Sequence, residues 1–88
     1  MKYTIIIQWS DEDQCYVVSL PEFTNVMQPC THGDSYEEAL KNAQEVLEML
    51  IESALADSET LPEPQTFNHS FKSLLNNKIP DFSKKSGI

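Results

Sequence analysis

The chain has 88 residues, 40% of them hydrophobic and 23% charged, which is enough for one small globular domain. Fourteen acidic residues against six lysines and no arginine give a net charge of −8, and thirteen of those acidic residues precede position 69. Nucleic-acid binding depends on cations that neutralise phosphates, so this composition excludes a nucleic-acid-binding body and favours a basic protein partner; the alternative is an acidic surface that only keeps the protein soluble.

The first half of the chain predicts three β-strands. Residues 2–9 alternate with period two and are rich in β-formers, and both faces of this strand are fairly apolar. A polar turn at 10–14 leads into a second strand at 15–20, which we expect to form an antiparallel hairpin with the first. A third extended segment is expected at 26–31. Because Pro29 has no N–H to donate, this segment should lie at a sheet edge or be bulged there.

A long helix is predicted from Tyr36 to about Ala56. Ser35 and Glu38 form a capping box, in which the Ser35 hydroxyl accepts from the Glu38 N–H and the Glu38 carboxylate accepts from the Ser35 N–H. Gly33 suits a tight turn before the helix, because glycine tolerates a positive φ. The apolar stripe expected to face the sheet consists of Tyr36, Ala39, Leu40, Ala43, Val46, Leu47, Leu50, Ile51, Ala54 and Leu55.

The other face of this helix is polar and mostly acidic. It carries Glu37, Glu38, Lys41, Asn42, Glu45, Glu48 and Glu52. Together the elements predict an α+β fold: a three-stranded antiparallel β-sheet with one long helix packed on one face (β-β-β-α). The second face of the sheet, which holds whichever of Ile6, Val17 and their neighbours the helix does not cover, is then left for a partner, a second protomer or the C-terminal segment.

Residues 1–67 are expected to form this domain, and residues 68–88 a C-terminal amphipathic segment with a lysine-containing tail. Leu61–Pro64 contains two prolines and should be extended. Asn68 is a candidate cap for a short helix to about Asn77, and the same residues also suit an irregular arm. Pro80 and the tail beyond it should end the ordered structure.

The sequence contains no run of about 18 apolar residues, which a membrane span would need. The N-terminal apolar run is too short for a signal peptide. We therefore expect a cytoplasmic protein in which Cys15 and Cys30 are reduced thiols. A small domain gains stability by burying more surface, so we also expect a homo-oligomer, a dimer or higher.

Cys30, His32 and Asp34 alternate, which places their side chains on one face of an extended chain, with Cys15 nearby in the hairpin. These are zinc-ligand types, and a thiol beside an imidazole also suggests nucleophilic catalysis. Structural zinc sites have two close pairs of ligands, and this chain has one. The structural interpretation is a buried Cys30 that packs as a small hydrophobic residue and an exposed His32. We assign no catalytic, cofactor-binding or metal-binding residue.

Three further clusters have a structural and a functional interpretation. Asp11-Glu12-Asp13 lacks the glycine and the ligand spacing of a calcium loop, so we expect a solvated hairpin tip. Trp9 with Tyr3 and Tyr16 resembles a base-stacking platform, but without basic neighbours core or interface packing is favoured. The helix glutamates would either mimic a phosphate track or form an ordinary solvated face.

An ordered set of motifs resembles the HicB family of antitoxins. The set consists of Lys2–Ile7, an acidic hairpin tip, Tyr16–Val18, Leu20–Glu22, Gly33–Leu40 and Leu61–Pro64. The resemblance covers residues 2–64 and implies a β-β-β-α domain with a partial RNase H-like fold that is not a nuclease. It also implies a partner: a small basic mRNA-cleaving toxin, HicA, whose active site the antitoxin covers.

The chain departs from the family pattern in two places. Pro21–Asn25 reads PEFTN where many members have Pro, an acidic residue, Leu, Pro and Gly, and the stretch to Gly33 is a few residues longer than usual. The third strand is therefore expected to be shifted or bulged. Many members also continue into a helix-turn-helix or ribbon-helix-helix domain. The short segment after Pro64 has no arginine, so we do not expect direct DNA binding or autoregulation by this chain.

The leading hypothesis is thus a non-enzymatic HicB-like antitoxin that binds and neutralises a small basic HicA-type toxin, with no cofactor. Two alternatives remain open. One is a stand-alone, self-associating regulatory protein without a toxin partner. The other is a small metal-dependent hydrolase or zinc-binding protein that uses Cys30, His32 and Asp34.

Overall fold

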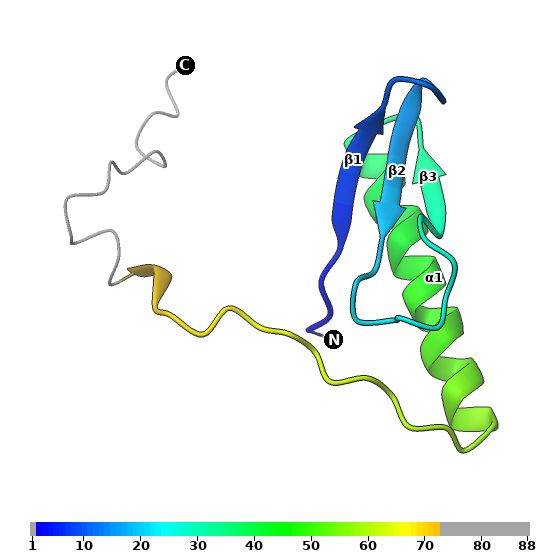
Figure 1. The fold of residues 1–88 in the computed structure, drawn as a ribbon, viewed down its shortest axis with the longest axis vertical. Helices are drawn as coiled ribbons and strands as arrows, with labels where there is room; N and C mark the ends of the chain where they lie inside the picture. Colours follow the sequence, from blue (N-terminus) through cyan, green and yellow to red (C-terminus); the bar gives the residue numbers. More distant parts are fainter. Residues whose placement is uncertain (1, 73–88) are drawn as a thin grey trace.

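A computed structural model describes residues 2–72 of the chain. Its elements are β1 (Ile6–Ser10), β2 (Cys15–Ser19), β3 (Thr31–Gly33) and α1 (Tyr36–Ala56). The strands form one antiparallel sheet in the order β1-β2-β3, and α1 crosses one face of it (Figure 1). The predicted α+β fold, β-β-β-α, is confirmed. Most of the short helix or arm predicted from residue 68, and the predicted tail, lie outside the described residues.

The hairpin of β1 and β2 forms as the alternating pattern predicts. Ile7 pairs with Val18, and both side chains belong to the hydrophobic core beneath α1. The next residue on each strand points to the opposite face of the sheet. Gln14 closes the polar tip with a φ of 56°, and its N–H donates to the Ser10 carbonyl oxygen at 2.8 Å. Four residues, 11–14, therefore connect the two strands.

The first strand is shorter than predicted: it begins at Ile6 rather than at residue 2. The backbone N–H of Thr4 donates to the side-chain carboxylate of Glu22, at 3.1 Å to each oxygen. Because this N–H is bonded to a side chain rather than to a neighbouring strand, regular pairing starts only at Ile6.

The third strand is also displaced from its predicted position. It was expected at 26–31 and is found at Thr31–Gly33. The physical reason is the side-chain amide of Gln28, which accepts from the N–H of Leu20 and donates to the carbonyl oxygen of Leu20, both at 3.0 Å. A side chain thus takes the place that a pairing strand would take at the end of β2. Pro29 was expected within this strand but lies outside it, before β3, and β3 itself forms an edge of the sheet.

The helix starts where the capping box predicts. Ser35 has extended backbone angles (φ −141°, ψ 167°), and its hydroxyl accepts from the Glu38 N–H at 3.1 Å. The reciprocal bond differs by one residue from the prediction, because the Glu38 carboxylate accepts from the N–H of Asp34, at 2.6 Å, rather than from that of Ser35. Both bonds satisfy backbone donors at the start of α1.

Gly33 is required for close approach rather than for a positive φ. No described glycine has a positive φ, so the conformational reason given by the sequence is wrong. A Cβ atom on Gly33 would lie 2.7 Å from the Cα of Ala39 and 2.8 Å from the carbonyl carbon of Glu38. The end of β3 therefore packs directly against the backbone of the first turn of α1, where no side chain fits.

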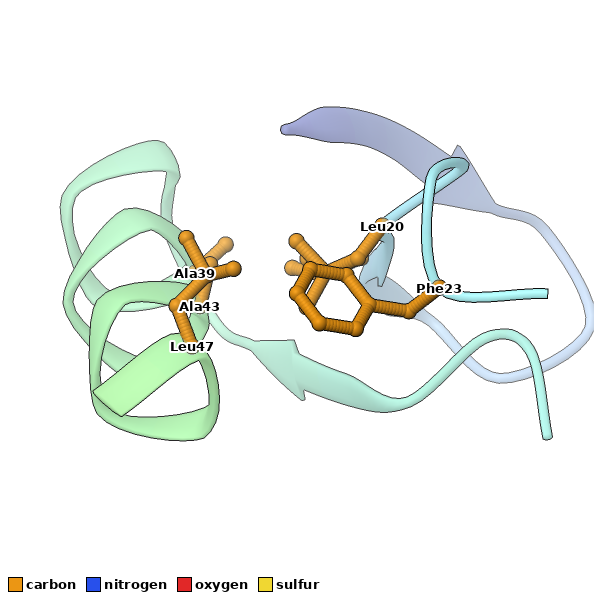
Figure 2. Packing of buried hydrophobic residues seen from close by; sticks show 6 residues of the cluster. Leu20, Phe23, Ala39, Ala43 and Leu47 are labelled. Atoms are coloured by element: carbon orange, nitrogen blue, oxygen red, sulfur yellow. The ribbon is translucent and has the colours of Figure 1, made fainter. Parts of the chain in front are cut away.

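The core lies between the sheet and α1, where buried residues from both sides meet (Figure 2). They are Val18, Leu20, Phe23, Ala39, Ala43 and Leu47. The small Ala39 and Ala43 side chains let the helix approach the sheet closely. The buried stripe is narrower than predicted, since Tyr36 is 64% exposed and Leu55 67% exposed. Leu55 lies near the end of α1 that extends past the strands in Figure 1.

Candidate functional site

The predicted acidic face of α1 lies in solvent. Its exposed residues, which we call the acidic face, are Glu37, Glu38, Lys41, Glu45, Glu48 and Glu52. Asn42 is the exception on this side, because its side-chain amide donates to the His32 carbonyl oxygen at 2.7 Å and ties α1 to β3. Five carboxylates against one ammonium group make this surface complementary to a basic partner.

Among residues 2–72, no helix combines the length and the hydropathy that a membrane-spanning helix requires.

The face of the sheet that α1 does not cover carries a mixture of small, polar and apolar side chains. By strand register these residues, which we call the outer sheet face, are Ile6, Gln8, Cys15, Val17, Ser19 and His32. The sequence left open which of Ile6, Val17 and their neighbours the helix covers, and the register places both Ile6 and Val17 on the uncovered face. An open hollow of about 550 Å³ lies at the β2–β3 side and is lined by Asp13, Cys15, Val17, Pro29, Cys30, Thr31 and His32.

The thiol and imidazole candidates Cys15, Cys30 and His32 all line this hollow. The Cys30 Sγ donates to the Val18 carbonyl oxygen at 3.6 Å, and burial raises the pKa of the Cys30 thiol above its ordinary value. Such a thiol stays protonated and is a weak nucleophile. His32 is exposed in β3. In the described part of the chain no three His, Cys, Asp or Glu side chains are close enough to hold a metal ion, so the zinc hypothesis finds no site there.

The acidic hairpin tip uses its side chains to shape the turn. An Asp11 carboxylate oxygen accepts from the Trp9 indole N–H at 3.0 Å. The Ser10 hydroxyl accepts from the Asp13 N–H and donates to the Asp13 carboxylate, both at 3.1 Å. These are bonds of an exposed turn, in agreement with the solvated tip expected from the sequence.

The aromatic residues form two groups rather than one platform. Trp9 contacts Tyr16 edge-on with ring centroids 5.0 Å apart, and Tyr16 contacts Tyr36 of α1 at 4.4 Å. Tyr3 lies elsewhere, with its ring 4.9 Å from that of Phe23. The favoured interpretation, packing rather than base stacking, fits these contacts. Trp9 nevertheless remains 47% exposed at the edge of the sheet.

A buried carboxylate joins the two ends of the described chain, and sequence reasoning missed it. Glu22 is only 6% exposed. Its oxygens accept from the Thr4 N–H and hydroxyl and, at 2.9 Å, from the backbone N–H of Gln65. The Tyr3 hydroxyl adds a bond to the Pro62 carbonyl oxygen at 2.7 Å. These contacts attach the segment after α1 to the residues that precede β1. We call them the Glu22 junction.

The hydrogen bonds also determine the ionisation of Glu22. Burial alone would raise the pKa of this carboxyl group, but the bonds from Gln65 and Thr4 outweigh it and hold the pKa below its ordinary value. Glu22 is therefore a charged structural residue at neutral pH. The available sequence signals were the Leu20–Glu22 and Leu61–Pro64 motifs, which do not indicate that the two segments meet.

A scan against known families matches residues 3–82 to the HicB-like antitoxins of bacterial toxin–antitoxin systems. The match extends beyond residue 64, where the motifs quoted from the sequence end. Comparison with curated proteins and with solved structures found no match. Because the family match spans nearly the whole chain, the protein belongs to the HicB-like antitoxin family of bacterial toxin–antitoxin systems.

Proposed function

We propose that the chain is a non-enzymatic, cytoplasmic antitoxin that binds a small basic mRNA-cleaving toxin of the HicA type and covers its active site. Family membership supports the antitoxin role. The observation that carries the choice of a basic partner is the acidic face of α1, where five carboxylates lie exposed along one helix.

The acidic face would act in two ways. Complementary charge speeds encounter with a basic protein and disfavours wrong partners. Once bound, the same carboxylates place negative charge beside the toxin's active site, and this charge repels the phosphates of an approaching RNA. Because exposed charges are screened by salt, the association should weaken as ionic strength rises.

A charge-reversal experiment tests the surface. The toxin to be tested is the product of any small basic reading frame found beside this gene, and its dissociation constant from the chain is measured by titration calorimetry. The triple variant Glu45→Lys, Glu48→Lys, Glu52→Lys should weaken binding by about tenfold or more, since exposed charge pairs contribute up to about 1 kcal/mol each.

The matched control is the triple variant Glu12→Lys, Glu59→Lys, Glu63→Lys, which changes the net charge equally at exposed positions outside α1. It should bind nearly as well as the original chain at physiological salt. Equal weakening by both triple variants would show that only net charge matters and would reject the acidic face as the docking surface.

The alternative is a stand-alone regulatory protein that associates with itself and has no toxin partner. The uncharged edge of the sheet described below supports the self-association in this alternative, and it does not bear on whether a toxin partner exists. Gene context distinguishes the toxin-binding antitoxin from the stand-alone protein. If no small basic reading frame lies beside the gene, there is no candidate toxin, and the toxin-binding proposal is contradicted.

A further inference from the structure

The two edges of the sheet differ. β1 and β3 are the outer strands, and among the described residues β1 pairs only with β2. The β3 edge is short and partly capped, because the Asn42 side chain donates to the His32 carbonyl oxygen at 2.7 Å. The β1 edge is five residues long, and no side-chain bond to its backbone is found within residues 2–72. An edge of this kind offers unpaired N–H and C=O groups to another strand.

The side chains of β1 include none of the features that usually prevent an edge strand from pairing with another chain. Edge strands are usually protected by charges, prolines or bulges. From Tyr3 to Ser10 the chain has no charged residue and no proline, although the surrounding protein is strongly acidic. Trp9 is 47% exposed and Ile6 38% exposed. The β1 edge is thus a neutral, partly apolar strip on an acidic body, where two identical copies can approach without direct charge repulsion.

We propose that a second copy of this chain adds its β1 to this edge in antiparallel orientation, with the two-fold axis at Gln8, the central residue of β1. The product is a continuous sheet made from two three-stranded sheets, with both helices on the same face. In this register Ile7 of each copy lies opposite Trp9 of the other, and the two Gln8 side chains meet on the outer sheet face. Aromatic–β-branched pairs such as Ile7–Trp9 are favourable across strands.

A second copy fits this edge because a two-fold interface uses the same strand twice, so a neutral strip on one copy always meets a neutral strip on the other. The basic partner proposed above has no electrostatic reason to choose this strip and is better matched by the acidic face of α1. The inference does not depend on the proposed toxin, since both surfaces can be used at once.

The test is the self-association constant, measured by sedimentation equilibrium on the full chain. The original chain should form dimers, or multiples of two. Gln8→Lys places like charges opposite each other at the axis and should weaken association by about fivefold or more. The matched control Met49→Lys puts the same charge on α1, at a side chain that is 63% exposed, and should leave association unchanged. Because added lysine lowers the net negative charge, general repulsion cannot explain a loss at Gln8.

A charge swap makes the test independent of any effect on folding. Gln8→Glu and Gln8→Lys should each associate weakly alone, and an equal mixture of the two should recover dimers. Concentration-dependent protection of β1 amides from hydrogen exchange in the original chain provides a second readout. A chain that stays monomeric at millimolar concentration, a Gln8→Lys variant that associates as tightly as the original, or a mixture that recovers nothing would overturn the proposal. A monomer whose toxin binding is lost on Gln8→Lys would instead assign the edge to the toxin.

Discussion

Replacing Glu22 by Gln removes the buried charge that connects Thr4 to Gln65. The carboxylate accepts from the backbone N–H and hydroxyl of Thr4 and from the N–H of Gln65, at 2.9 to 3.1 Å. Glutamine keeps one acceptor oxygen and directs an amide NH₂ at donors that then lose their partner. Each buried donor left unsatisfied costs about 1–3 kcal/mol, so we expect a loss of roughly 2–4 kcal/mol. A domain of this size has a total stability on the order of 5 kcal/mol.

The assay is urea denaturation at pH 7, followed by far-UV circular dichroism. Glu63→Gln is the matched control, because Glu63 lies in the same segment after α1 and is exposed. The control should change the free energy of unfolding by less than about 0.5 kcal/mol. If Glu22→Gln is as mild as the control, the carboxylate does not hold the two segments together and the reasoning fails.

The lowered pKa of Glu22 gives the same residue a pH signature. Because its folded-state pKa lies below the ordinary value of 4.5, ionised Glu22 stabilises the fold above that value. This contribution is lost as the pH falls below the ordinary value and through the folded-state pKa. The unfolding free energy of the original chain should therefore drop more steeply on acidification than that of Glu22→Gln. If the unfolding free energies of the original chain and of Glu22→Gln fall in parallel on acidification, the pKa of Glu22 is not lowered in the folded protein.

Two further predictions concern the start of α1, both measured by urea denaturation. Ser35→Ala removes the oxygen that accepts from the Glu38 N–H and should cost about 1 kcal/mol; an unchanged midpoint would argue against the cap. Gly33→Ala puts a Cβ against the backbone of Ala39 and should cost about 1–3 kcal/mol, because neither backbone can move without disturbing the sheet or the helix. A stabilising Gly33→Ala would mean that β3 and α1 are not in close contact.

The parts of the fold that depend on local chemistry were predictable from the sequence. The alternation of residues 2–9 and 15–20 indicated the hairpin, and the Ser35–Glu38 capping box located the first residue of α1. Even there, tertiary contacts changed the details. Gly33 is needed because α1 lies against it, and a periodic pattern cannot reveal such an approach.

The features that the sequence did not predict depend on residues far apart in the chain. The longer stretch before Gly33 predicted that the third strand would be shifted or bulged, but not the cause: the Gln28 side chain pairs with the backbone of Leu20, and no propensity rule anticipates such a pairing. Glu22 is buried because Thr4 and Gln65 meet it from 18 and 43 positions away. The exposed acidic face, in contrast, followed directly from helical spacing, so the candidate docking surface was visible in the sequence.

The most direct test of the proposed function uses any small basic reading frame found beside this gene: bacteria express it under an inducible promoter, with and without this chain, and their growth is measured. Cellular mRNA is followed by northern blot. We expect induction of the toxin alone to arrest growth and fragment mRNA, and co-expression of the chain to restore both growth and intact mRNA. Continued arrest and mRNA cleavage in cells that contain the folded chain would contradict the antitoxin function proposed here.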